Sequence, residues 1–245
     1  MPLIDIVEDT EFVEIRGQHF QNVRDIAVRV IGAHRVVRIV DCTFVNCDLA
    51  LSIGGNTPSA QVALGAVEVV GCHIEDCAQG MVVLAKHVTI ERNRVINTTA
   101  GDPIYTKGRR AIIARNHVVG ASGANAGIFC KGAERTESSP NADGYGVVIC
   151  NNIVADIDAP GIYTAAGRAQ VLGNLVENAT SYGVVMATYL DGEHIAIGNV
   201  VADLETPQAG ILHWGPPPSY PLVGDGPLNM VLGQFEPIAI SGPPT

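Results

Sequence analysis

The amino-acid sequence predicts an all-β fold, a parallel β-helix formed by one chain, with about nine coils and three short strands in each coil. A short motif recurs along almost the whole chain, and apolar residues alternate with polar ones on both sides of its key residue. Val, Ile, Leu and Ala dominate the apolar residues and aromatic residues are few. This composition suits short strands packed around a narrow interior.

The motif is clearest at residues 88–98, V-T-I-E-R-N-R-V-I-N-T, where Asn93 is the key residue. Four later copies keep Asn at this position, two earlier copies have Cys42 and Cys72 there, and two degenerate copies are centred on Gln18 and Gly233. The key positions are 18, 42, 72, 93, 116, 152, 174, 199 and 233. A basal period near 22 residues with three longer spacings indicates one repeated unit that carries insertions.

Each copy predicts two strands that meet in a tight turn at the key residue. A third strand follows about ten residues later and usually opens with Gly or Pro, at Pro103, Gly127, Gly161, Gly183 and Gly210. Coils stacked about 4.8 Å apart place the Asn residues in a ladder. A second polar column lies four residues further on, at Asn22, Asn46, Asp76, Asn97, Asp156, Asn178 and Asp203. Because both columns recur in nearly every coil, we expect them to be structural.

The repeat spans the chain, so residues 1–245 are expected to form a single domain. Coils are expected over about residues 12–238, with an N-terminal cap at 1–11 and a Pro- and Gly-rich C-terminal segment at 215–245. The longer spacings place insertions at Gly54–Gly65, Lys131–Gly146 and Trp214–Pro227, with a smaller one at Ala187–Glu193. All follow the third strand, so they are expected to leave one edge and either wall a groove beside that strand or be tolerated insertions.

Counting from the key residues places Tyr105, Phe129 and Tyr163 in one outward column of the third strand, and Lys107 and Lys131 two residues further on. An aromatic strip beside two cations suits a sugar ring that carries a carboxylate. Repulsion between the two ammonium groups lowers the pKa of one of them, which favours a role as a base.

The candidate catalytic residues are therefore Lys107, Lys131, Tyr105 and Tyr163, and the candidate substrate-binding residues are Phe129, Arg109, Arg110 and Arg135. The alternative is a stabilising aromatic stack beside ordinary exposed lysines.

A second candidate set surrounds the loop T-Y-L-D-G-E-H, which brings Tyr189, Asp191 and His194 near His213 and Trp214 of the next coil. His194 and His213 are candidate catalytic groups, and Tyr189, Asp191 and Trp214 are candidate substrate-binding residues. The sequence leaves open whether His194 points inward or into the groove.

No metal site and no cofactor are expected. The seven His lack ligand spacing, and an extended strand separates Cys42 from Cys47 too far for one zinc ion. We expect Cys42 to stack on Cys72 and Cys47 on Cys77, as reduced thiols.

The net charge of -10 disfavours nucleic acid as a partner. All fifteen Lys and Arg lie at or before Arg168, which indicates either a local anion site or a lopsided solvated surface. No apolar run is long enough to cross a membrane, and no secretory signal is visible at the N-terminus, so a cytoplasmic protein is expected.

In later coils, outward positions beside the ladder become apolar, which predicts a homo-oligomer, a dimer or trimer. These positions are Ile112, Val148, Cys150, Ile153, Leu172, Leu175, Ile195, Ile197 and Val200.

With its short strands around an inward Asn at the second turn, the chain resembles the right-handed parallel β-helix, pectate-lyase-like superfamily over about residues 12–238. The resemblance implies a right-handed helix. It also points to an active site on the outer face of the third strand, if the protein is an enzyme. It does not imply one activity, because that superfamily includes lyases, hydrolases, esterases, epimerases, phage tailspikes and noncatalytic modules.

The superfamily's catalytic motifs are absent from the expected face. Clustered Asp residues are missing there, and Asp102-Pro103 is followed by Ile104 rather than by the His of the epimerase D-P-H motif.

The leading hypothesis is an enzyme that acts on a carbohydrate or similar polyhydroxylated, anionic substrate by lyase or epimerase chemistry. The alternatives are a noncatalytic β-helix that binds or assembles, and a cyclase or isomerase of small-molecule biosynthesis.

Overall fold

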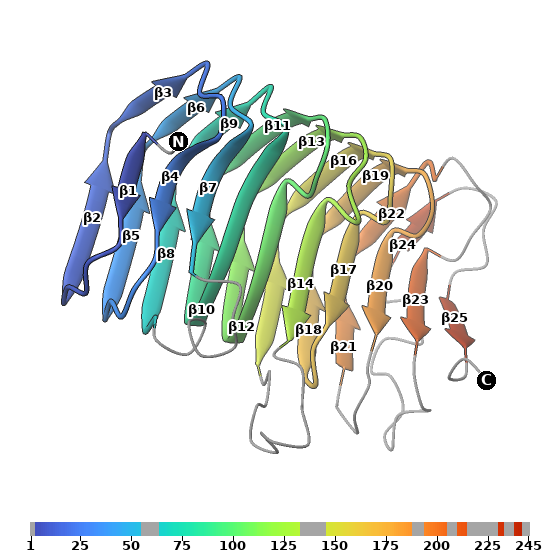
Figure 1. The fold of residues 1–245 in the computed structure, drawn as a ribbon. Helices are drawn as coiled ribbons and strands as arrows, with labels where there is room; N and C mark the ends of the chain where they lie inside the picture. The colour runs from blue at the N-terminus through green and yellow to red at the C-terminus, as the bar shows by residue number, and fades with distance from the viewer. Residues whose placement is uncertain are drawn as a thin grey trace.

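The computed structural model describes residues 3–54, 64–132, 146–187, 194–204, 210–214, 230–232 and 238–241. In these segments every regular element is a β-strand, and the strands coil into a parallel β-helix (Figure 1). The prediction of a parallel β-helix is confirmed. The described strands make about seven turns, slightly fewer than the nine expected.

The strands fall into three sets, which follow one another in each coil and pair in parallel with the same set in the next coil. The first strands, before the key residue, are β2 (Phe12–Arg16), β5 (Val36–Val40), β8 (Ala66–Val70), β15 (Val147–Cys150), β18 (Ala169–Leu172) and β21 (His194–Ile197). The second strands are β3 (His19–Gln21), β6 (Thr43–Val45), β9 (His73–Glu75), β11 (Arg94–Thr98), β13 (His117–Ala121), β16 (Ile153–Ile157), β19 (Leu175–Ala179), β22 (Val200–Ala202) and β24 (Met230–Leu232). The third strands are β1 (Ile4–Ile6), β4 (Ile26–Val30), β7 (Leu49–Ile53), β14 (Ile128–Gly132), β17 (Ile162–Ala165), β20 (Val184–Ala187), β23 (Ile211–Trp214) and β25 (Ile238–Ser241).

Two long strands each serve as the third strand of one coil and the first strand of the next. They are β10 (Gln79–Glu91) and β12 (Ile104–Ala114), and they pair with each other over ten residues. Their continuity joins the first and third strands into one 16-stranded sheet, whereas the second strands form a separate 9-stranded sheet. At β10 and β12, the corner between the third and first strands is therefore part of one continuous strand.

The predicted Asn ladder is present and fully hydrogen-bonded. The Oδ1 atom of Asn116 accepts from the backbone N–H and the Nδ2 of Asn93, both at 3.0 Å, and its own Nδ2 donates to the Ile90 carbonyl and to Asn152 Oδ1. The same pattern continues through Asn174 to Asn199. Each of these Asn side chains is buried, so the ladder satisfies turn amides that water does not reach.

Backbone conformation explains the second polar column. Its seven predicted members, Asn22, Asn46, Asp76, Asn97, Asp156, Asn178 and Asp203, all have a φ between 50° and 57°. This left-handed region is best tolerated by Gly, Asn and Asp, so the recurrence of Asn and Asp is a requirement of the turn. The column is structural, as expected.

The glycines that open the third strands are required by close packing. A Cβ added to Gly161 would lie 2.3 Å from Val176 Cγ1, and one added to Gly183 would lie 2.3 Å from Val201 Cγ1. The second strand of the next coil therefore packs directly against the start of the third strand.

Strands also form in the two end segments, residues 1–11 and 215–245. Within the expected N-terminal cap, β1 pairs with β4. Within residues 215–245, β24 pairs with β22 and β25 pairs with β23, which adds strands to both sheets. Val200, the residue after Asn199, pairs with Met230, so the last copy of the motif begins its second strand four residues earlier than the expected key residue Gly233 requires. The predicted position of that degenerate copy is therefore wrong.

Candidate functional site

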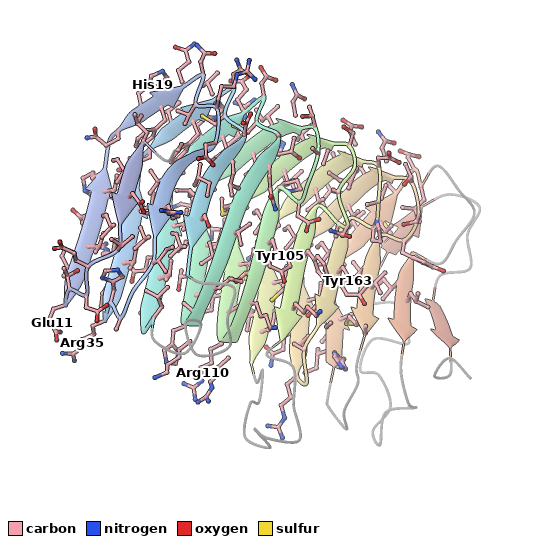
Figure 2. The ribbon with its side chains drawn as sticks, in the orientation of Figure 1. Glu11, His19, Arg35, Tyr105, Arg110 and Tyr163 are labelled. Atoms are coloured by element: carbon pink, nitrogen blue, oxygen red, sulfur yellow. The ribbon has the colours of Figure 1, made fainter. Side chains whose placement is uncertain are left out.

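The third-strand face, defined here as the outward side chains of Tyr105, Lys107, Phe129, Lys131 and Tyr163, comes from three neighbouring strands. In β12 and β14, Tyr105 is in register with Phe129, and Lys107 with Lys131. In β17, Tyr163 is in register with Phe129. The predicted columns are therefore correct, and Figure 2 shows Tyr105 and Tyr163 on the front of the third strands.

The three aromatic rings form a continuous row, but they do not stack face to face. The centroids of Tyr105 and Phe129 are 5.4 Å apart with an interplanar angle of 76°, and those of Phe129 and Tyr163 are 4.9 Å apart with an angle of 83°. These are edge-to-face contacts, each of which stabilises by about 0.5–1.5 kcal/mol beyond the buried area. The third-strand face therefore does not present a flat platform of three coplanar rings.

Three of the four residues that adjoin the third-strand face in its two columns are buried, and the fourth, Val82, is half-buried. Leu84, which precedes Lys107 in its column, is buried, and so are Val185 and Ala187, which follow Tyr163 and Ala165. The five residues of the third-strand face are instead half-buried. Half-burial strengthens electrostatic interactions of the lysines relative to freely exposed side chains.

The third-strand face offers three kinds of chemistry. The lysine ammonium groups supply charge for a carboxylate, the tyrosine hydroxyls supply proton donors, and the aromatic rings supply apolar surface for the C–H face of a sugar. From β10 to β20 these two columns contain no carboxylate side chain, and the nearest one in them among the described residues is Asp5 of β1, which pairs with Arg29 of β4. Within that part of the chain the face is thus suited to an anionic ligand.

Arg109 and Arg110 lie next to this face without being part of it. They are consecutive exposed residues at the corner where β12 passes from third to first strand. Arg110 is in register with His87 of β10. Figure 2 shows Arg110 projecting from the edge at which Arg35 also lies.

The second candidate set is only partly described. His194 is 3% exposed and is in register with the inward, buried Ala169, so it takes the inward orientation that the sequence left open. The backbones of His213 and Trp214 continue the third-strand columns from Met186 and Ala187. Arg135, Tyr189 and Asp191 lie outside the described residues, as do the side chains of His213 and Trp214.

The cysteines form stacked pairs in the interior. Cys47 donates its backbone N–H to Cys77 Sγ at 3.4 Å, and all four thiols of the pairs are buried and free. The hydrogen bond with Cys42, together with burial, raises the pKa of Cys72, and that with Cys47 does the same for Cys77. Burial also raises the pKa of Cys130 to about 12. These three thiols stay protonated at neutral pH, in keeping with a packing role.

No three His, Cys, Asp or Glu side chains of the described segments are placed to hold a metal ion. Those segments also contain no helix long and apolar enough to cross a membrane.

Sequence reasoning missed Lys86 and His87. Counting along the columns places them at the same corner as Arg109 and Arg110, one coil earlier. The sequence contains the information needed to find them, because the repeat that aligns Tyr105 with Phe129 also aligns His87 with Arg110.

The fold defines a β-helix protein, and its third-strand face presents two lysines beside a row of three aromatic side chains. A family model described as a right-handed β-helix region matches residues 4–199. The chain belongs to this right-handed β-helix family. Neither a curated protein nor a solved structure matches the chain.

Proposed function

We propose that the third-strand face binds a saccharide that carries carboxylates, and that the protein acts on it as a lyase or epimerase. The observation that supports this is the register of three aromatic residues and two lysines over three successive coils. A sugar chain that runs along the helix axis meets one aromatic side chain per coil, about 4.8 Å apart. The lysine column lies beside it, where the substrate carboxylates would be bound.

The chemistry begins at the carbon next to the carboxylate of a uronate. One lysine, as its ammonium, binds the carboxylate and stabilises the negative charge that develops when the neighbouring C–H bond breaks. The other, as its neutral amine, takes that proton. The electron pair of the C–H bond then forms the C4–C5 double bond as the C4–O bond breaks, and a tyrosine hydroxyl gives a proton to the leaving oxygen. In an epimerase, the tyrosine returns a proton to C5 from the opposite side.

Binding is tested with a leucine at the centre of the row. Phe129→Leu keeps similar volume but removes the ring that contacts both tyrosines. We expect the dissociation constant for a uronate oligosaccharide to rise about threefold to tenfold in calorimetric titration. The control Phe12→Leu removes an exposed Phe from β2, at the N-terminal end of the helix. It should leave the dissociation constant unchanged. Equal affinities of wild type and Phe129→Leu, or no uronate binding by wild type, would contradict the proposal.

A second proposal is that the protein self-associates through its outer apolar face. The predicted positions lie in continuous columns, as in Cys150, Leu172 and Ile197, or Ile153, Leu175 and Val200. Ile153 is 42% exposed and Ile112 is 48% exposed. Large aliphatic side chains exposed in adjoining strands favour burial against a second copy.

Light scattering in solution tests this second proposal. We expect a dimer or trimer for wild type and a monomer for the double variant Ile153→Asp/Leu175→Asp, because two carboxylates are costly to bury in an apolar interface. Phe12→Asp, in another exposed apolar position, serves as the control and should keep the wild-type mass. A monomeric wild type would exclude this assembly.

A further inference from the structure

The corner between the third and first strands carries four basic side chains on two adjacent strands. Lys86 and His87 lie on β10, and Arg109 and Arg110 on β12. The pairing of His87 with Arg110 places Lys86 beside Arg109, with neighbouring strands about 4.8 Å apart. His87, Arg109 and Arg110 are exposed, and Lys86 is half-buried. We call this set the basic corner.

No carboxylate balances the basic corner within the described residues. Lys86, Arg109 and Arg110 form no ion pair there, whereas Arg29 pairs with Asp5, Arg38 with Glu68 and Arg115 with Glu91. The described residues of the same turn in the coils on either side, residues 64–66 and 146–147, contain no Asp or Glu. Three fixed positive charges within one coil spacing repel one another, in a chain whose net charge is -10. Such a cluster favours a bound anion.

The backbone holds this cluster rigidly and leaves room beside it. Strands β10 and β12 run through the corner without a loop, and a Cβ on Gly108 would lie 2.5 Å from the Ala85 carbonyl oxygen. On the outer sides, Gly65 precedes Lys86 in its column, and Gly146 follows Arg110. The nearest atom to a Cβ on Gly146 would be Arg110 Cγ at 4.0 Å. Small neighbours on both sides leave the guanidinium groups accessible to a ligand.

The number of donors and charges indicates the class of ligand. Two guanidinium groups offer up to five N–H donors each, and the lysine adds three. A single carboxylate has two oxygens and one charge, which leaves much of this set unmatched. A phosphate or sulfate group has three or more oxygens, and arginine recognises such groups in bidentate geometry.

We propose that the basic corner is an anion-binding site for a phosphate or sulfate group, either free or as an ester. The site lies next to the third-strand face, two residues further along β12 than Lys107, and does not depend on catalysis there. It gives Lys86 and His87 a role that the repeat pattern alone did not suggest, and it assigns Arg109 and Arg110 to a ligand group other than a uronate carboxylate.

Calorimetric titration with pyrophosphate, sulfate and malonate at low ionic strength tests the site. We expect wild type to bind pyrophosphate, and to bind sulfate more tightly than malonate, which has the same charge but carries it on carboxylates. The double variant Arg109→Gln/Arg110→Gln should weaken pyrophosphate binding about tenfold or more, since each exposed charged contact contributes up to about fivefold. The control Arg24→Gln/Arg94→Gln removes the same charge from exposed positions elsewhere and should change binding less than about twofold.

A second variant distinguishes an effect on binding from an effect on folding. Lys86→Gln lies on the other strand and should weaken pyrophosphate binding severalfold with an unchanged unfolding midpoint. The proposal is overturned if wild type does not bind pyrophosphate, if the control weakens binding as much as the corner variants do, or if malonate binds as tightly as sulfate. Uronate binding at the third-strand face is measured separately with Phe129→Leu, so failure at one site leaves the other result intact.

Discussion

Replacing Asn116 with Ala is expected to destabilise the β-helix by roughly 3–6 kcal/mol. The Asn116 side chain is 1% exposed and hydrogen-bonds the Asn residues of the coils before and after it. Its removal takes the side-chain partner from the buried backbone N–H of Asn93 and from the Ile90 carbonyl, at about 1–3 kcal/mol per group. It also removes one of the two hydrogen bonds of Asn93 Nδ2, which keeps its bond to the Val69 carbonyl. Denaturant unfolding followed by circular dichroism measures the change.

The control for this variant is an Asn that lies in the other column. Asn178 is exposed, has a φ of 50° and donates to Asp156 at 2.9 Å. Asn178→Gly keeps a residue that tolerates this backbone conformation and removes one exposed hydrogen bond, so its cost should stay below about 1 kcal/mol. Similar losses for Asn116→Ala and Asn178→Gly would show that the ladder is not a principal source of stability.

Replacing both lysines of the third-strand face with Met should reduce turnover of a uronate oligosaccharide by about 100-fold or more. The variant Lys107→Met/Lys131→Met removes the proposed base and the charge that binds the carboxylate, and general base catalysis alone contributes about 100-fold to 10,000-fold. Methionine retains much of the length and apolar character of the lysine stem, so the strands should keep their register. Turnover is followed by the ultraviolet absorbance of the new double bond, or by the C5 configuration in NMR.

The matched control for turnover is Arg24→Gln/Arg94→Gln, which lowers the positive charge by the same amount away from the third-strand face. It should keep wild-type turnover, and all three proteins should keep one solution mass and one unfolding midpoint. If the lysine variant turns over substrate as fast as the control, lysine-based proton abstraction is excluded. The binding proposal would then rest on the aromatic row alone.

The fold could be predicted from the sequence because a β-helix repeats its constraints in every coil. Three positions of each coil favour a particular residue type and recur at a regular spacing. They are the inward Asn, the left-handed turn residue four positions later, and the glycine that opens the third strand. Once Asn93 is aligned with Asn116, the register of the central columns follows, and it puts Tyr105, Phe129 and Tyr163 in one column.

The geometry of the third-strand face depended on forces that spacing does not encode. Register brings the rings into neighbouring coils, but their quadrupoles favour the edge-to-face contacts seen between Phe129 and both tyrosines. The orientation of His194 was ambiguous because a long spacing precedes it, and only the pairing of β18 with β21 fixes its inward position. Three short strands per coil leave Lys86 and His87 between two strands and outside the expected site, whereas in β10 this corner is part of one continuous strand.

The most direct test of the proposed function is a crystal structure of the protein grown with a mixture of uronate oligosaccharides. We predict a saccharide chain along the helix axis across β12, β14 and β17, with its rings against Tyr105, Phe129 and Tyr163 and a carboxylate within hydrogen-bond distance of Lys107 or Lys131. A third-strand face without ligand at saturating saccharide, or a saccharide bound elsewhere on the β-helix, would contradict it.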